Sequence, residues 1–156
     1  NLPDFKNIQA VFLLDIFEHL SDGEIDLVLK KIKNWGGKDG IQIIIHTDNN
    51  NYLRFIRPIT DLIAVCLGQT SFKQIKEEKK YVLEGHINLT TASKLRKKLS
   101  QNNFRILKLR YPCIDANIVR AHLGGLGQYC ALVQVAYFLG KIFYFLRPSF
   151  YIVAIG

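Results

Sequence analysis

Residues 8–15 read IQAVFLLD, a nearly continuous apolar run that ends abruptly at an aspartate. A run of this kind is expected of a strand that is covered on both faces in a parallel sheet. Shortly downstream, Ser21 and Glu24 stand at the spacing of a capping box, and apolar residues recur behind them at helical intervals. The pattern predicts a strand at residues 8–14 followed by a helix over residues 22–34.

The next apolar run, IQIIIH at residues 41–46, predicts a second buried strand because β-branched side chains favour that conformation. Strand, helix and strand in this order make one βαβ unit, in which the two strands run parallel. The carboxyl ends of parallel strands meet at one edge of the sheet, where ligands bind in open α/β sheets. We therefore expect Asp15, His46 and Asp48 to lie on the same rim.

Further elements follow this unit, although the pattern is weaker. It predicts a helix at 59–67, an exposed loop or helix end at 73–80, a helix capped by Thr90 or Thr91, and strands at 104–111 and 150–155. The apolar alternation of the strand at 104–111 breaks near Lys108, which is typical of an edge strand or a bulge. No linker divides the chain, so we expect one domain.

Residues 129–146 are apolar on every side, apart from Gln134, Gly140 and Lys141. A helix without a polar face is buried in protein or in lipid. A bilayer span needs ~20 apolar residues, and an internal lysine costs up to roughly 3 kcal/mol on insertion. We therefore expect a packed or interfacial helix that brings the protein to a membrane or a partner, or else a core element.

The charge of the chain is unevenly distributed. The formal net charge is +8, and residues 86–156 hold ten of the 21 basic residues but only one acid, Asp115. This asymmetry predicts an anionic partner, either nucleic acid or a membrane surface, or else an ordinary solvated face. Phosphate contacts would come from Arg96, Lys97, Lys98, Arg105, Lys108 and Arg110. We expect nucleic acid to be the weaker alternative, because Phe and Tyr lie in apolar runs instead of alternating with Arg.

The cysteines Cys66, Cys113 and Cys130 form no CxxC pair, which argues against a disulfide framework or a thiolate zinc site. We expect them to be small core residues in a reducing compartment, the cytoplasm, with membrane association as a further expectation. The chain contains no Met, and we expect it to be a piece of a longer protein.

One cluster of polar residues follows the first predicted strand. Asp15, Glu18 and His19 stand at positions i, i+3 and i+4, so a helical turn would place all three on one face, where they could share a ligand. Alternatively, the two carboxylates cap the turn and His19 packs beneath it.

These residues also carry a resemblance. The stretch VFLLDIFEHLSD at residues 11–22, followed by Gly36-Gly37, a strand and Thr47-Asp48-Asn49, resembles the second half of a class I S-adenosylmethionine-dependent methyltransferase. The stretch GHINLTT at residues 85–91 is similar to the entry into that family's later helix, and residues 150–155 resemble its seventh strand.

The resemblance implies the carboxyl-terminal part of a single Rossmann-like α/β domain over residues 1–156, with strands parallel except for an antiparallel last strand. The glycine-rich cofactor loop of the family has no counterpart upstream of Asp15, since the first glycine is Gly23. This departure supports the expectation of a piece of a longer protein.

The resemblance also implies a function and a site. The intact protein would transfer a methyl group from S-adenosylmethionine to a small-molecule or lipid-linked acceptor. Asp15, Ile16 and Phe17 would line the cofactor pocket, and His19 with Glu18 would serve catalysis, the imidazole taking a proton from the acceptor. The substrate side would hold His46, Asp48, Asn49 and His86.

Two alternatives accompany this interpretation. In some quinone-biosynthesis O-methyltransferases, an acid-x-x-Glu-His pattern at this place coordinates a divalent cation; the same pattern occurs in relatives without metal, and we expect none here. A basic nucleic-acid-binding module or a non-catalytic methyltransferase-like domain is the alternative function.

Overall fold

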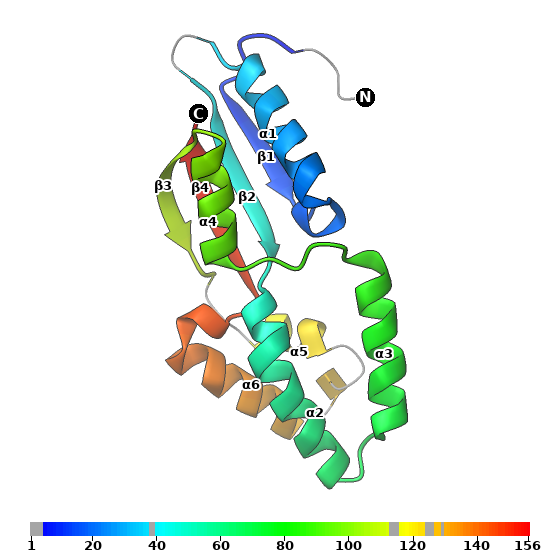
Figure 1. Cartoon of the computed structure of the whole chain (residues 1–156). Coiled ribbons are helices and arrows are strands. Elements are labelled where there is room, and N and C mark those ends of the chain that lie inside the picture. Colours follow the sequence, from blue (N-terminus) through cyan, green and yellow to red (C-terminus); the bar gives the residue numbers. More distant parts are fainter. Residues whose placement is uncertain (1–4, 38–39, 113–115, 124–126, 129) are drawn as a thin grey trace. The chain divides into compact units, whose positions relative to one another are not determined.

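The structure of the chain is a computed structural model that describes residues 5–37, 40–112, 116–123, 127–128 and 130–156. The chain divides into two compact units, each described here by itself (Figure 1). The first unit comprises Asn1–Asp48, Ile87–Arg110 and Phe150–Gly156, and the second comprises Asn49–His86 and Tyr111–Ser149. The expectation of one domain over the whole chain stays a prediction.

A four-stranded mixed sheet forms the centre of the first unit. Its strands are β1 (Ala10–Leu14), β2 (Gln42–Asp48), β3 (Arg105–Arg110) and β4 (Ser149–Ile155), arranged in the order β1-β2-β4-β3. β1 and β2 pair in parallel, with Leu14 opposite His46, which confirms the predicted βαβ unit. β4 is antiparallel to β3, and Figure 1 shows it running against β2 as well. The last strand is therefore inserted antiparallel between two strands that point the same way, as predicted.

The irregularity predicted near Lys108 is present. β3 lies at an edge of the sheet, and its register against β4 shifts between Ile106 and Lys108. A shift of this kind is a bulge, which disturbs the ladder of an edge strand and limits its pairing with other chains.

Two capped helices cover one face of this sheet. In α1 (Asp22–Trp35), the Ser21 hydroxyl accepts a hydrogen bond from the Glu24 amide, and the Glu24 carboxylate accepts one from the Ser21 amide. In α4 (Ala92–Gln101), the cap is Thr91. Asp26 of α1 accepts a hydrogen bond from Lys98 of α4, so the helices lie side by side. Burial follows the predicted periodicity: Ile25, Leu29 and Ile32 of α1, and Leu95 and Leu99 of α4.

The second unit is helical. It contains a π-helical turn η2 (Tyr52–Ile56), α2 (Arg57–Cys66), α3 (Phe72–Gly85), α5 (Ala116–Leu123), α6 (Cys130–Ile142) and a 3-10 turn η4 (Tyr144–Leu146). Its core is made by buried residues of η2, α2, α5 and α6. None of the helices described here is long and apolar enough to cross a bilayer.

Three expectations about this unit need correction. The charged run at 73–80 lies inside α3, because Ser71 and Gln74 form a second capping box that starts a helix of 14 residues. The apolar segment 129–146 is not one helix: α6 ends at Ile142, where the Arg147 side chain donates to the Gly140 carbonyl. Cys66 and Cys130 are exposed instead of buried in the core; Cys113 lies outside the described residues.

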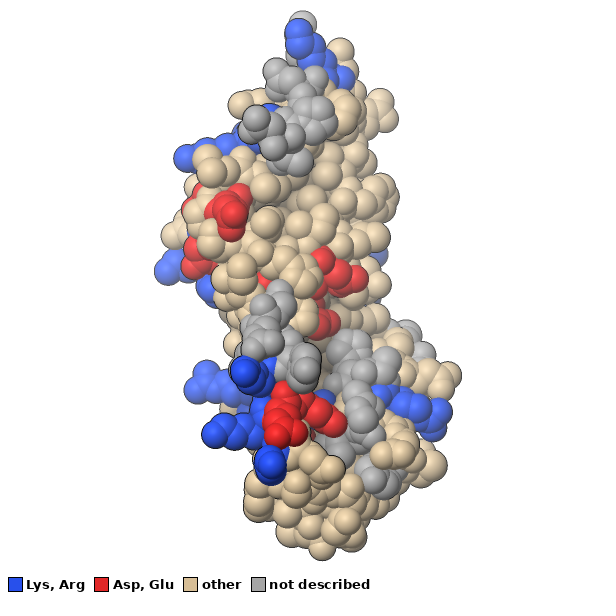
Figure 2. Space-filling model, turned by 90° about the vertical axis from the view of Figure 1, so that its right-hand side faces the viewer, with Lys and Arg blue, Asp and Glu red and all other residues tan. Residues whose placement is uncertain are grey.

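The surface charge is mixed. On the face that Figure 2 shows, acidic and basic side chains stand beside one another among broad uncharged areas. This face therefore carries no extended patch of a single sign.

Candidate functional site at the carboxyl ends of β1 and β2

The candidate site begins where β1 ends. The Asp15 amide donates to the His46 carbonyl at 3.1 Å, and the Asp15 carboxylate lies 2.7 Å from Nδ1 of the His46 ring. Asp15 has a φ of 51°, in the left-handed region that few residues other than glycine, asparagine and aspartate adopt readily. The strand ends at Asp15 and His46 are thus neighbours on one rim, which confirms the prediction from the crossover.

His46 links three strands at this rim. Its Nδ1 contacts the carboxylate of Asp15, which follows β1, and the centre of its ring lies 4.4 Å from that of Tyr151 in β4. The contact with Asp15 therefore fixes the orientation of the ring.

Glu18 is buried, unlike the usual position of a carboxylate. It lies in the 3-10 turn η1 (Phe17–His19), is 2% exposed, and accepts a hydrogen bond of 2.8 Å from the hydroxyl of Thr47 in β2. Its backbone carbonyl accepts from the Asn88 amide at 2.9 Å. Glu18 therefore ties the turn to the sheet.

The turn divides the polar cluster that the sequence suggested. Asp15 precedes the turn and contacts His46, Glu18 points inward to Thr47, and His19 is exposed. The expectation that all three share one helical face is wrong, because the left-handed residue and the 3-10 turn replace the α-helical spacing. Glu18 and His19 still bring a carboxylate oxygen and a ring nitrogen within 4.8 Å of each other, but Asp15 is not part of that group.

The other predicted site residues have different environments. Ile16 is exposed beside Asp15, whereas the Phe17 side chain is 1% exposed and belongs to the core, so only its backbone can face a ligand. Asp48 ends β2 on the same rim. Asn49 and His86 belong to the second unit, where the Asn49 amide donates to the carbonyls of Phe145 and Arg147 at 2.8 Å each. Asn49 is thus a structural residue of that unit.

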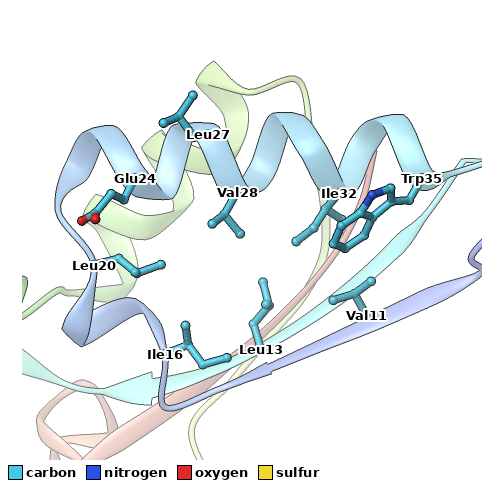
Figure 3. A pocket seen from close by; sticks show the side chains of 9 residues that line it. All are labelled: Val11, Leu13, Ile16, Leu20, Glu24, Leu27, Val28, Ile32 and Trp35. Atoms are coloured by element: carbon cyan, nitrogen blue, oxygen red, sulfur yellow. The ribbon is translucent and has the colours of Figure 1, made fainter. Parts of the chain in front are cut away.

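A cavity of about 550 Å³ adjoins the rim, between β1 and α1 (Figure 3). Its walls are almost wholly apolar and come from β1, from the turn that follows it and from one side of α1: Val11, Leu13, Ile16, Leu20, Glu24, Leu27, Val28, Ile32 and Trp35. Sequence reasoning missed it. Val11 and Leu13 alternate on the strand and Val28, Ile32 and Trp35 share one helix side, but this pattern also describes an ordinary core.

Trp35 closes the cavity at the end of α1. Its side chain is 5% exposed, yet its indole N–H finds no hydrogen-bond acceptor among the residues that the structure describes. A buried indole N–H usually has a partner. The six-membered ring of the indole faces the cavity, while its nitrogen lies on the helix side of the ring (Figure 3).

Comparison with known proteins gives a structural likeness. No protein-family model matches the sequence, and no curated protein matches it. The chain is similar to the solved structure of PKMT2 from Rickettsia typhi, a methyltransferase, with a TM-score of 0.51 and 15% sequence identity. The similarity covers 99% of this chain and 36% of the other, so the chain spans about a third of that protein's length. At this identity the shared property is the fold, a mixed α/β arrangement that is also found in a methyltransferase.

Proposed function

We propose that the protein to which this chain belongs transfers a methyl group from S-adenosylmethionine, and that the first unit forms one wall of the cofactor site. The observation that carries the proposal is the sheet order β1-β2-β4-β3 with its single antiparallel strand, combined with the polar rim at Asp15. This strand arrangement is what the resemblance to class I methyltransferases implies for the second half of a Rossmann-like sheet. The likeness to a methyltransferase structure supports the same choice.

The rim suits one side of such a cofactor. Asp15 offers an exposed carboxylate, and its backbone amide is bonded to the His46 carbonyl. Ile16 beside it offers an exposed apolar surface. A carboxylate favours a cationic or hydroxyl-bearing ligand, and an apolar side chain favours a purine ring. The glycine-rich backbone that would hold the other side is not found among residues 1–22. We infer that this wall comes from sequence outside the chain.

The cofactor, when bound, supplies an electrophilic methyl group to a nucleophilic oxygen, nitrogen or carbon. The residues of this chain would orient the reacting groups and take up the proton that the nucleophile releases. His19 is exposed on the turn and can take a proton from the group that receives the methyl. Buried Glu18 positions the turn through its hydrogen bond with Thr47. Holding the nucleophile in line with the methyl group supplies much of the rate, so few catalytic side chains are required. The proposed acceptor is a small or lipid-linked molecule.

Nucleic acid is the weaker candidate partner. Arg105, Lys108 and Arg110 are exposed on the edge strand β3. Lys98, however, is paired with Asp26 at 2.7 Å, which removes one of the expected phosphate contacts.

The test is calorimetric titration of the longer protein with S-adenosylmethionine and with its demethylated product. We expect micromolar binding, weakened roughly tenfold or more by Asp15→Ala, since a lost charge-assisted hydrogen bond is worth ~1.5–3 kcal/mol. The matched control is Asp26→Asn, because the Asp26 carboxylate is bonded to Lys98 of α4 and does not lie on the rim. Absence of binding to the longer protein, or equal weakening by both variants, would contradict the proposal.

A further inference from the structure

We infer that the end of α6 and the turn after it form a surface that binds an anionic lipid membrane. This surface, the aromatic ridge, consists of five apolar side chains that are each between 43% and 61% exposed: Phe138, Ile142, Phe143, Tyr144 and Phe145. Single exposed apolar residues are common on proteins. Five of them within eight consecutive positions, three with rings in contact, are a concentration of exposed apolar surface, which typically marks an interaction site.

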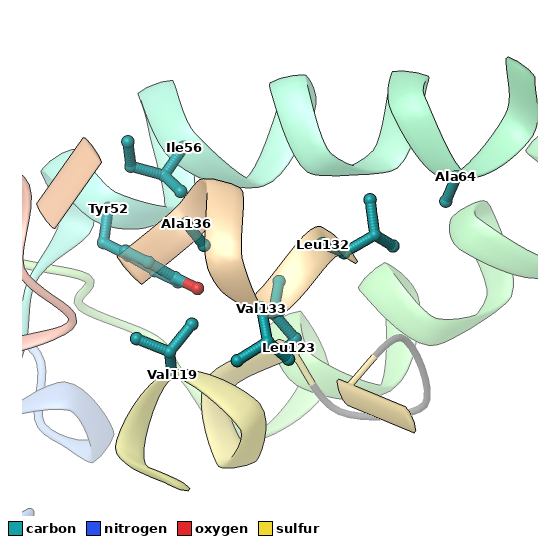
Figure 4. Close-up of a cluster of buried hydrophobic side chains, with 8 residues drawn as sticks. All are labelled: Tyr52, Ile56, Ala64, Val119, Leu123, Leu132, Val133 and Ala136. Carbon is teal, nitrogen blue, oxygen red and sulfur yellow. The ribbon is translucent and has the colours of Figure 1, made fainter. Parts of the chain in front are cut away.

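The ridge lies on the side of α6 that the core does not use. Leu132, Val133 and Ala136 pack into the hydrophobic cluster of the second unit, together with residues of η2, α2 and α5 (Figure 4). Phe138 and Ile142 stand one helical turn apart on the other side of the helix and remain exposed. The apolar character of α6 thus has two causes: one side is core, and the other is surface.

The backbone beneath the ridge is firmly held. Arg147 donates hydrogen bonds to the carbonyls of Gly140, Tyr111 and Pro112. The buried Asn49 amide donates to the carbonyls of Phe145 and Arg147, at 2.8 Å each. These bonds close the chain around the exposed rings, so the ridge is an ordered surface and not the frayed end of a helix.

The rings also contact one another. The centres of the Phe143 and Phe145 rings are 6.1 Å apart, and those of Tyr144 and Phe145 are 6.0 Å apart, both in edge-on arrangements. Tyr144 further contacts Tyr111, whose ring centre is 5.4 Å away. Phenylalanine and tyrosine rings held in this way have an apolar body and, for tyrosine, a polar tip, which is the chemistry of the boundary between lipid and water.

The local charge favours a lipid surface as the occupant. Residues 130–149 contain Lys141 and Arg147 but no aspartate or glutamate. Lys141 is exposed, and its ammonium lies 5.9 Å from the centre of the Tyr137 ring, next to the ridge. Since the Arg147 guanidinium is bonded to backbone carbonyls, Lys141 is the exposed cation of residues 130–149. An apolar patch with an exposed cation beside it is attracted to the negative headgroups of a membrane and can then insert its rings among the acyl chains. Because α6 has only 13 residues, the contact is interfacial.

The test is flotation of the 156-residue chain with vesicles of phosphatidylcholine, with or without phosphatidylserine. We expect the chain to float with the vesicles that contain phosphatidylserine and to be released by high salt. Phe138→Ser and Phe143→Ser should each weaken the affinity for the vesicles by roughly tenfold or more, since each removes a large apolar side chain that would be buried in the lipid. Lys141→Gln should weaken binding to the anionic vesicles alone.

The matched control is Phe72→Ser. Phe72 is 67% exposed on α3 of the same unit, so its substitution removes a comparable aromatic surface outside the ridge. Thermal unfolding followed by circular dichroism checks that every variant is folded. Failure of the unaltered chain to float, an equal loss with Phe72→Ser, or a dimer that depends on the ridge and excludes vesicles would each overturn the inference. The result does not depend on methyl transfer, because the readout is lipid binding alone.

Discussion

The carboxylate of Asp15 and Nδ1 of His46 lie 2.7 Å apart, across the carboxyl ends of two parallel strands. This pair joins the residue that ends β1 to a ring that also contacts Tyr151 of β4. One contact thus fixes the position of the rim relative to three strands. The consequence is that changes at Asp15 affect both the backbone turn and the orientation of His46, and the two effects can be separated by substitution.

Asp15→Asn should be nearly neutral for stability, whereas Asp15→Val should cost about 1–3 kcal/mol. Asparagine tolerates a φ near 51° and keeps an oxygen that can accept from His46, while a β-branched residue is strained there. Urea unfolding followed by tryptophan fluorescence measures the difference. Similar losses in both variants would show that the charge, and not the backbone conformation, sets the cost.

Thr47→Val should destabilise the first unit by about 1–3 kcal/mol, because the buried Glu18 carboxylate would lose its hydroxyl donor. Thr60→Val is the control. Thr60 is equally buried, but its hydroxyl donates to the backbone carbonyls of Ile56 and Arg57. Removing a donor from a neutral carbonyl costs less free energy than removing one from a buried carboxylate. Free energies of unfolding in urea compare the two. A Thr47→Val cost no greater than that of Thr60→Val would refute the role of Glu18 as the residue that ties the turn to β2.

Arg57→Met should destabilise the second unit by about 1.5–3 kcal/mol, since it removes one of the two cations that pair with buried Asp61, the other being Lys79 at 2.7 Å. The Arg57 guanidinium bonds Asp61 and Glu78 at 2.9 Å each, and donates to the Leu123 carbonyl at 3.0 Å. Arg54→Met is the control, because Arg54 is exposed and its guanidinium lies over the ring of Phe55. Helical circular dichroism during thermal unfolding should show a large loss for Arg57→Met and little change for the control.

Stability should also fall in acid through Asp26. Hydrogen bonds from Lys98 and then Asn102 hold the pKa of the Asp26 carboxyl below its ordinary value. A carboxyl whose pKa is lower in the folded state stabilises the fold above the unfolded pKa, and this contribution disappears as the pH drops through the folded value. The loss is therefore expected below about pH 4. Urea midpoints measured across this range should decline less steeply for Asp26→Asn than for the unaltered chain.

The βαβ unit could be predicted because its signals are local. The capping box at Ser21 and the β-branched run at residues 41–46 fix the element types, and the handedness of the crossover then places both strand ends on one rim. Lys108 similarly marked the bulge, since one broken alternation is visible in a strand.

The rest of the site depends on contacts that spacing does not encode. The positions of Asp15, Glu18 and His19 are compatible with an α-helical turn, and only the left-handed φ of Asp15 and the burial of Glu18 against Thr47 show that the turn is 3-10. The cavity beside Trp35 could not be predicted either, because the sequence pattern of an apolar surface is the same whether or not another element covers it. The exposed side of α6 could not be predicted, because its side chains are as apolar as those on the side that packs into the core.

The 156-residue chain alone should not bind S-adenosylmethionine with useful affinity, even though its first unit is folded around β1 and β2. The proposed site needs two walls, and this chain supplies the rim at Asp15 without a glycine-rich loop upstream of it. Missing two or three charge-assisted hydrogen bonds, at roughly 1.5–3 kcal/mol each, would weaken a micromolar site to millimolar or worse. Calorimetric titration of the chain with the cofactor gives the answer, with the longer protein as the positive control. Micromolar binding by the isolated chain would mean that residues 1–156 already contain both walls, with the cavity lined by Leu27 and Trp35 as the candidate for the second wall.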